Sequence, residues 1–391
     1  MQWLFLLYLL LKPFYIFESG TLQPSDAILV VCFFYYICIS RKSKLFQCSI
    51  DIILLIFVAF VFVINLIYYL IYFETEFIVS SMYYVFNLML VLVFRTLVLD
   101  RSFLKKLFMV CRINLWVQLG IYVTGLGRFY VDANGETGRY LGSFNDPNQF
   151  AFFCFCLVLT MFMITQFDSV DAHINILDYM LLVFMVYVSS STGMFLAICV
   201  FFFSYILTMI FSSAGRRNPA KRKQAVHVLV TVMIVAIAVL LMKNTLGDIV
   251  ENSMIYQRIM EKLSMSETSG GTTVWQDRNI DKVYLYPLQN LFGAGQGYYY
   301  RFSRAYSSGE IHSTLLSILF CYGVVPLLIV LNWMKRNIRR TTWLFVPVFL
   351  SLLIESFTLL NQRQPFFWMF FVLAYSYKIL ERESDENAVC P

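Results

Sequence analysis

Arginine is the residue type whose placement in this sequence most clearly indicates chemistry. Residues 244–312 and the shorter stretches around positions 128, 139 and 363 carry seven arginines but only two lysines. A guanidinium group binds a phosphate through two parallel hydrogen bonds, whereas an ammonium group acts as a point charge. The bias predicts a site for a phosphate or pyrophosphate group, although neighbouring acids could instead neutralise these side chains. The seven are Arg128, Arg139, Arg258, Arg278, Arg301, Arg304 and Arg363.

Two titratable residues are candidates for proton transfer or charge pairing. His312 stands just before an apolar run, and an imidazole titrates near neutral pH, which suits a general base. A histidine at the start of a helix can equally be structural. Glu355 lies inside another apolar run, where an ionisable side chain is either functional or paired. Lys12, also within an apolar run, is the candidate ion-pair partner of Glu355.

A polar stretch, Arg139-Tyr-Leu-Gly-Ser-Phe-Asn-Asp-Pro-Asn148, precedes a further apolar run. Helix capping accounts for part of it, because Asp146 suits the N-cap position and Pro147 the first helical position. Capping does not account for Arg139 or Asn148, so both are candidate ligand-binding residues.

A glycine-rich and tyrosine-rich stretch runs from Gly293 to Tyr300. Gly295 and Gly297 could let backbone N–H groups approach a phosphate, although a simple turn is the default interpretation. Tyr299 and its neighbours could stack on sugar rings, or they could form an aromatic belt at a membrane interface.

The composition shows which elements must position these residues. Of 391 residues, 59% are hydrophobic and 14% charged, against about 25% charged in a soluble domain. Twelve membrane helices of about 20 residues would use about 240 residues, which excludes both a soluble enzyme with an anchor and a disordered chain. We expect one all-α polytopic membrane domain over residues 1–391. The predicted spans are 2–18, 26–40, 52–73, 77–94, 107–126, 148–166, 174–190, 193–213, 226–243, 313–333, 342–360 and 366–380.

The distribution of lysine and arginine predicts the orientation. One set of short connections holds fifteen basic residues, whereas the opposite set holds only Arg128, Arg139 and Arg363. Basic residues mark the cytoplasmic side, so both termini are expected in the cytoplasm. The net charge of +6 follows membrane sidedness and does not indicate a nucleic-acid partner.

Two connections are therefore expected outside the cytoplasm, at residues 127–147 and 244–312. Within the second, an amphipathic helix is predicted over 249–263. A Thr273-to-Gln276 capping box should open a second helix that carries Arg278 in its second turn and ends near Pro287. This connection contains no cysteine, so no disulfide supports it, and the cysteines elsewhere are expected to serve packing and not metal binding.

These residues resemble the motifs of the O-antigen polymerase and O-antigen ligase superfamily. The resemblance rests on Arg139-x-x-Gly142-x-Phe144-x-x-Pro147-Asn148, a serine-rich hairpin at 189–193, and a long external connection with Arg278, the glycine repeat and His312. It covers roughly residues 130–335. Two departures stand out. The hairpin lacks the arginine that often follows its serine, and Ser313 replaces an asparagine after the histidine. Arg139 or Arg301 is expected to supply the missing arginine.

The resemblance implies a GT-C-like membrane glycosyltransferase of the bacterial inner membrane, acting on its outer side without a metal or other cofactor. Its partners would be undecaprenyl-pyrophosphate-linked oligosaccharides as donor and acceptor, the lipid bilayer, and a chain-length regulator protein. His312 and Arg278 are the expected catalytic residues. The expected substrate-binding residues are Arg139, Asn148, Arg301, Arg304, Gly295, Gly297, Tyr299 and Glu355.

Polymerisation of an O-antigen or capsule is the reaction that we expect. The first alternative is a ligase, which would transfer the glycan to lipid A core. The second alternative, from another class, is a flippase for lipid-linked oligosaccharides. A flippase would show two pseudo-symmetric halves, and the sequence contains no internal repeat.

Overall fold

The computed structural model of the chain describes most of its length. The described residues are 1–17, 23–39, 48–131, 137–168, 170–211, 226–227, 229–230, 254–264, 273–339 and 341–388.

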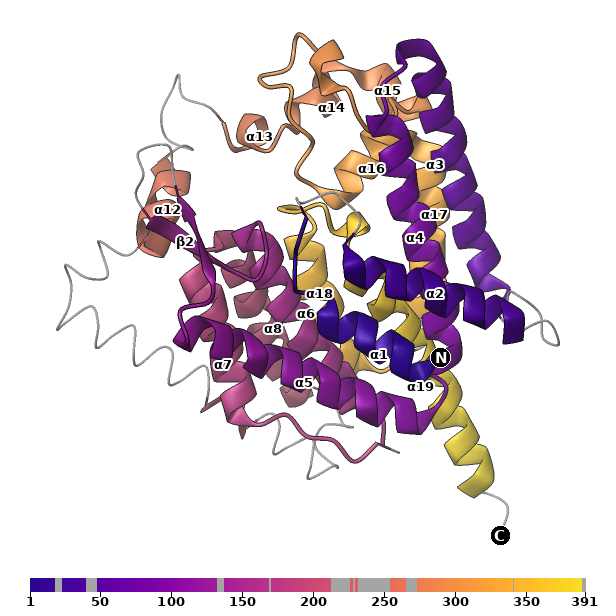
Figure 1. Cartoon of the computed structure of the whole chain (residues 1–391), viewed down its shortest axis with the longest axis vertical. Coiled ribbons are helices and arrows are strands. Elements are labelled where there is room, and N and C mark those ends of the chain that lie inside the picture. Colours follow the sequence, from indigo (N-terminus) through magenta and orange to yellow (C-terminus); the bar gives the residue numbers. More distant parts are fainter. Residues whose placement is uncertain are drawn as a thin grey trace.

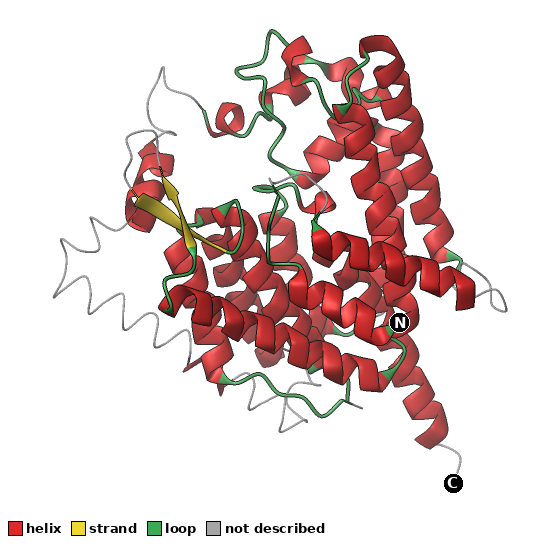
Figure 2. Cartoon of the chain, in the orientation of Figure 1, coloured by secondary structure: helices red, strands yellow, loops and turns green. Residues whose placement is uncertain are grey.

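The described chain is almost entirely helical (Figures 1 and 2). The α-helices are α1 (Gln2–Leu11), α2 (Pro24–Ile39), α3 (Ile50–Tyr72), α4 (Glu76–Leu97), α5 (Arg101–Val123), α6 (Pro147–Ile164), α7 (Ile176–Ser189), α8 (Thr192–Phe211), α12 (Met254–Ser264), α13 (Val274–Asp277), α14 (Asp281–Leu285), α15 (Pro287–Phe292), α16 (Thr314–Tyr322), α17 (Val324–Ile338), α18 (Val346–Glu355) and α19 (Pro365–Ala388). Single 3₁₀ turns are η2 (Tyr299–Arg301), η3 (Trp343–Phe345) and η4 (Asn361–Arg363).

Five helices, α3, α4, α5, α6 and α8, are long and apolar enough to cross a membrane. They correspond to five of the predicted spans. Shorter apolar helices occupy Gln2–Leu11, Pro24–Cys38, Ile176–Ser189 and Trp343–Glu355. The run at 313–333 forms two helices, α16 and α17, because Gly323 between them has φ +85° and ends the first. Most of the predicted span at 226–243 lies outside the described residues.

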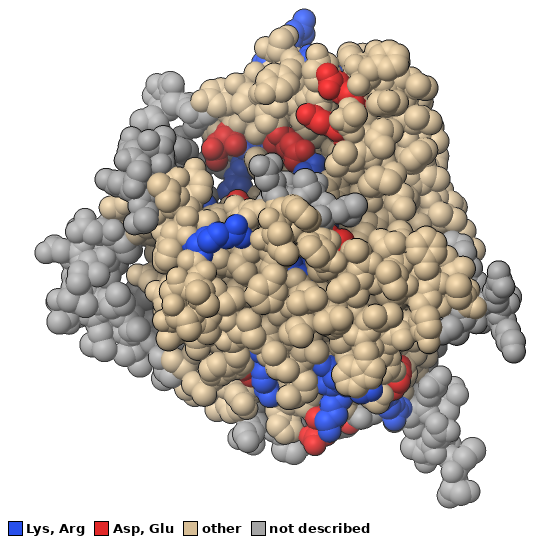
Figure 3. Space-filling view, viewed as in Figure 1, with Lys and Arg blue, Asp and Glu red and all other residues tan. Residues whose placement is uncertain are grey.

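Helices α3, α4 and α17 run along the long axis of the molecule, while α1, α2 and α5 cross it at a large angle (Figure 1). The short helices α13, α14 and α15 lie together at one end. On the face seen in Figure 3, one set of charged side chains lies around the hollow in the upper half and another along the lower edge, with an uncharged band between them. This distribution fits a protein that sits in a membrane.

Helix α6 lies at the centre of the described bundle, against α5, α7, α8 and α19. It is apolar on every side, as expected for a helix surrounded by protein. All of its residues are buried except Asn148 and Gln149. The predicted cap is confirmed, since Asp146 accepts hydrogen bonds from the backbone N–H groups of those two residues at 2.8 and 2.9 Å.

The connection before α6 contains a β-hairpin that the sequence analysis did not predict. Strand β1 (Arg128–Val131) pairs antiparallel with β2 (Thr137–Gly142). Alternation along β2 sends Tyr140 into the core, where its ring meets that of Phe150 edge-on at 5.2 Å. The neighbouring residue Arg139 therefore points the other way, towards the start of α6.

The segment from 273 to 292 differs from its prediction. The Thr273 capping box is present, with Gln276 Oε1 accepting from the Thr273 backbone N–H at 3.0 Å. However, α13 ends after one turn, because Asn279 adopts a left-handed conformation with φ +58°. A helix does end near Pro287, as predicted, because α14 ends at Leu285. Pro287 then opens α15, since proline suits the first helical turn. Arg278 consequently lies on a bend.

Candidate active site

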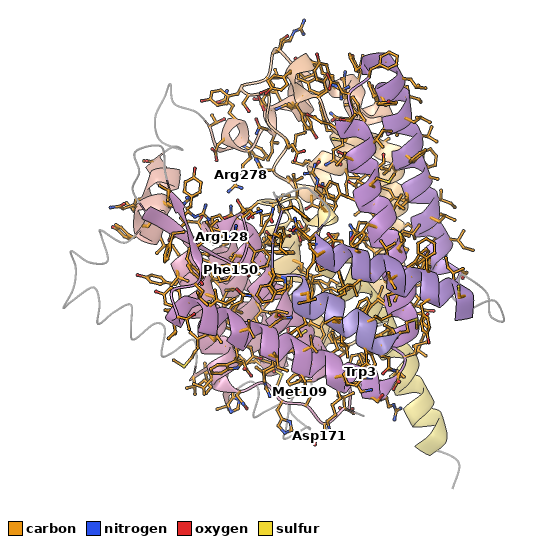
Figure 4. All side chains as sticks on the ribbon, in the orientation of Figure 1. Trp3, Met109, Arg128, Phe150, Asp171 and Arg278 are labelled. Atoms are coloured by element: carbon orange, nitrogen blue, oxygen red, sulfur yellow. The ribbon has the colours of Figure 1, made fainter. Side chains whose placement is uncertain are left out.

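A cavity of about 400 Å³ lies between the start of α6, the α7–α8 hairpin and α12. The end of α13, the chain before α16 and the connection from α18 to α19 complete its wall. This volume falls within the range of small-molecule sites, about 300–1,000 Å³. It brings together three predicted site residues, Asn148, Arg278 and His312, from regions far apart in sequence. Figure 4 shows Arg278 between the bend after α13, which carries it, and the N-terminal end of α6, where Phe150 is labelled.

Asn148 is held in a defined orientation by two hydrogen-bond donors. Its Oδ1 accepts from Arg139 Nη2 at 2.7 Å and from Ser191 Oγ at 2.9 Å. Because the oxygen takes both bonds, the amide NH₂ is left as a donor for the cavity that Asn148 lines. The side chain is thus prepared to donate to an anionic ligand.

Arg139 also reaches the serine-rich hairpin. Its Nε donates to the Ser189 carbonyl at 2.9 Å. The hairpin is tight, with α7 ending at Ser189 and α8 beginning at Thr192. Of the two arginines expected to replace the missing hairpin arginine, Arg139 is therefore the one that the structure brings there.

Arg139 has little compensation for its charge. Burial and the nearby Arg258 together lower its pKa to about 10, while Asp146 opposes the shift. The guanidinium still carries its proton at neutral pH. Among the described residues no carboxylate lies within ion-pair distance of Arg139 or Arg258, whereas Asp277 and Glu310, which also line the cavity, pair with Arg278 and Arg363. Helices α6 and α8 both begin at the cavity wall, and their N-terminal ends add partial positive charge there.

Arg278 and His312 are joined directly, because the His312 backbone N–H donates to the Arg278 carbonyl at 2.9 Å. Arg278 Nη1 donates to the Thr358 carbonyl at 2.7 Å, which ties this segment to the connection after α18. Burial lowers the pKa of Arg278; Asp277, whose carboxylate lies 3.8 Å away, opposes that shift, and Arg258 adds to it.

The imidazole of His312 is open to the cavity. No described residue forms a hydrogen bond with its ring. Partial burial lowers the pKa of His312 because it desolvates the charged imidazolium, and the charge of Arg278 also lowers it. The ring is therefore neutral at neutral pH and able to accept a proton from a ligand in the cavity.

Two cavity arginines were not among the predicted site residues. Arg258 comes from α12, and Arg363 from η4, where its Nη2 donates to Glu310 Oε1 at 2.6 Å. Both belong to the seven arginines in connections that are expected to be poor in basic charge, and that bias is the signal that could select them. The polar lining also includes Asp146, Asp277, Gln149 and Asn361. Figure 3 shows acidic and basic side chains around the hollow beside α13 and α14.

Glu355 lies behind the cavity wall and does not line it. Its side chain is fully buried and accepts a hydrogen bond from Asn361 Nδ2, while Asn361 itself lines the cavity. The suggested pairing with Lys12 is wrong, because Lys12 Nζ lies 2.7 Å from Asp26 Oδ1 in a separate buried ion pair. Glu355 is thus placed to orient Asn361 and not to contact a ligand.

The structure does not bring Arg301 or Arg304 to this cavity. Arg301 Nη2 donates to the carbonyls of Ala294 and Gly295, and its guanidinium lies 4.7 Å from the Tyr68 ring centre. These contacts fix the glycine-rich turn against α3. Arg304 is exposed, and its backbone N–H donates to Tyr286.

The glycines of this turn serve close packing. Gly295 has φ +69°, and a Cβ added there would lie 2.8 Å from the Tyr68 ring. A Cβ on Gly297 would meet Glu76 at 2.8 Å. Tyr299 is buried, with its hydroxyl 3.4 Å from Cys321 Sγ. Gly297 and Tyr299 line a second cavity beside the first.

The chain was also compared with known proteins. No protein-family model matches it, and no curated protein matches it significantly.

Proposed function

We propose that this chain is a membrane glycosyltransferase that polymerises a surface polysaccharide from undecaprenyl-pyrophosphate-linked repeat units. The proposal includes about twelve spans in a GT-C-like arrangement in the bacterial inner membrane. Both termini would be cytoplasmic and the cavity would open on the outer side.

The observation that carries the proposal is the convergence of Asn148, Arg278 and His312 on one cavity. The same residues carry the resemblance to the O-antigen polymerase and ligase superfamily. A neutral imidazole beside several fixed guanidinium groups suits a reaction that needs both a base and a site for a pyrophosphate leaving group.

In the proposed reaction, a hydroxyl of the acceptor sugar attacks the anomeric carbon of the donor glycan and inverts its configuration. The new C–O bond forms as the bond to pyrophosphate breaks, and the electron pair leaves with undecaprenyl pyrophosphate. His312 takes the hydroxyl proton. Arg258, Arg278 and the Asn148 amide stabilise the charge that develops on the leaving oxygen.

The preorganisation of these groups is the protein's main contribution. Arg139 holds Asn148 from behind, and the backbone bond between His312 and Arg278 keeps base and cation together. Donors that are already in position need no rearrangement at the moment of reaction, which is the condition under which electrostatic stabilisation is most effective.

The first test uses purified protein in lipid nanodiscs with lipid-linked repeat units. We expect a ladder of products and release of undecaprenyl pyrophosphate, and a loss of about a hundredfold or more in His312→Ala. If His312→Ala retains the full rate, the assignment of the base is wrong. If the wild type forms no ladder under any condition, the polymerase proposal fails.

The second test is deletion of the gene, followed by gel analysis of the surface polysaccharide. A single repeat unit on the lipid A core supports a polymerase. Core alone, with long lipid-linked chains accumulating, would indicate a ligase. Single units retained on the cytoplasmic face of the membrane would indicate a flippase.

A further inference from the structure

A second cavity of about 360 Å³ adjoins the arginine-lined one. It lies between the start of α4, η2 and the chain at 308–310. Glu310 and Arg363 line both cavities, and their side chains form an ion pair at 2.6 Å. This pair therefore stands at the boundary between the two spaces.

The second cavity has a different chemical character from the first. Its described lining includes two carboxylates, Glu76 and Glu310, and a single cation, Arg363, which Glu310 already neutralises. An anionic ligand would meet a net negative wall. Carboxylates accept hydrogen bonds only, so they favour a ligand that is rich in hydroxyl donors.

Aromatic rings provide a second type of contact in this cavity. Tyr300 lines it and is 76% exposed, so its ring is accessible to a ligand. Tyr83 forms part of the wall, and the Arg363 guanidinium lies over its ring, 5.2 Å from the ring centre. An accessible aromatic face beside hydrogen-bond acceptors suits a sugar ring, which has an apolar C–H face and a rim of hydroxyl groups.

We propose that this second cavity binds the uncharged sugar rings of the acceptor. The inference rests on the proposed function and adds to it a separate saccharide subsite next to the pyrophosphate site. A saccharide bound against Tyr300 would extend past the Glu310–Arg363 pair into the first cavity. There, its hydroxyl would meet His312, which follows Glu310 by two residues.

The proposal predicts that each of the two cavities binds a different simple ligand. The probes are inorganic pyrophosphate and a panel of methyl glycosides of glucose, galactose, mannose, rhamnose and N-acetylglucosamine. Binding to protein in nanodiscs is measured by calorimetry for pyrophosphate and by saturation-transfer NMR for the glycosides. Tyr300→Ala should weaken glycoside binding about tenfold and leave pyrophosphate binding unchanged. Arg258→Ala should show the opposite pattern.

Two further variants sharpen the experiment. Tyr300→Trp should restore glycoside binding, because it restores an aromatic face. Tyr284→Ala removes a tyrosine of similar exposure, 61%, that does not line the cavity, and should bind glycosides like the wild type. The proposal is overturned if no glycoside contacts the wild type, if Tyr284→Ala loses as much as Tyr300→Ala, or if Arg258→Ala is the variant that loses glycosides.

The polymerisation assay, run beside the binding assay, separates this proposal from the one on which it rests. If the protein forms product ladders but Tyr300→Ala binds glycosides as well as the wild type does, the saccharide subsite alone is refuted. Glycoside binding that depends on Tyr300, without any transfer, would support the subsite and refute the polymerase activity.

Discussion

Substitution of Asn148 by aspartate should separate ligand binding from stability. The change keeps the shape of the side chain but replaces the NH₂ donor that faces the cavity with a carboxylate oxygen. Arg139 Nη2, now 2.7 Å from Oδ1, would gain an ion pair in place of a neutral hydrogen bond. We therefore expect the melting temperature to stay the same or to rise, while pyrophosphate binding falls sharply.

The size of the loss can be worked from the contacts. A hydrogen bond to a charged group contributes about 1.5–3 kcal/mol, which corresponds to roughly 10- to 150-fold in affinity. The new carboxylate also repels the ligand, and two unit charges about 4 Å apart at an effective dielectric constant of about 20 interact by about 4 kcal/mol. Arg139 offsets part of that repulsion. A loss of at least about 100-fold is expected.

Asn148→Ala provides the comparison. It removes the donor without adding a charge, so it should weaken pyrophosphate binding less than Asn148→Asp does. It also leaves Arg139 Nη2 without its side-chain acceptor, so it should lower the melting temperature. Binding is measured by calorimetry and stability by thermal unfolding in nanodiscs. If Asn148→Asp binds pyrophosphate within about twofold of the wild type, the amide does not contact the ligand and the reasoning is refuted.

Other parts of the structure yield four further predictions. The pKa of His312 is lowered, and a general base works above its pKa. The acidic limb of the pH–rate profile should therefore lie below pH 6.5, the ordinary pKa of histidine. An acidic limb above pH 6.5 would contradict the assignment of His312 as the base. Gly295→Ala should destabilise the fold by more than about 1 kcal/mol in denaturant unfolding, since it combines positive φ with a Cβ 2.8 Å from Tyr68; an unchanged midpoint would refute this. Lys12→Met should cost about 3–5 kcal/mol, because Asp26 would stay buried and unpaired; restored stability in the double variant with Asp26→Leu is the check. Chelation with EDTA should leave the rate of polymerisation unchanged, as the family resemblance implies; a loss that added divalent metal restores would count against that mechanism.

Local features of this protein were predictable where neighbouring residues determine them. Asp146 and Pro147 mark the start of α6 because capping depends on residues within one turn. The same holds for Thr273 and Gln276 at α13. In contrast, the end of α13 depends on the left-handed conformation of Asn279, whose Oδ1 accepts from Ser307 Oγ across 28 residues. A contact of that range leaves no periodic signal in the sequence.

The arginines illustrate the same distinction at the site. The composition and the predicted orientation single out seven arginines in connections expected to be poor in basic charge. They do not indicate which of the seven share a cavity. Arg301 packs on the ring of Tyr68, while Arg258 and Arg363 enter the cavity from separate segments. Arg301 binds the carbonyls of Ala294 and Gly295 and packs against α3, whereas Arg363 pairs with Glu310 on the chain before α16. Only the tertiary arrangement distinguishes a structural arginine from a binding one.

The complete burial of α6 has a consequence for how this protein can be redesigned. Asn148 and Gln149 are its two residues that are not buried, and both face the cavity. A change anywhere further along α6 disturbs packing, so the wall that we propose contacts the leaving group offers almost no positions for variation. The short helices and turns between 273 and 312 carry exposed side chains, among them Tyr300 in the second cavity. Libraries aimed at altered sugar preference therefore belong in that segment, with the α6 wall kept constant.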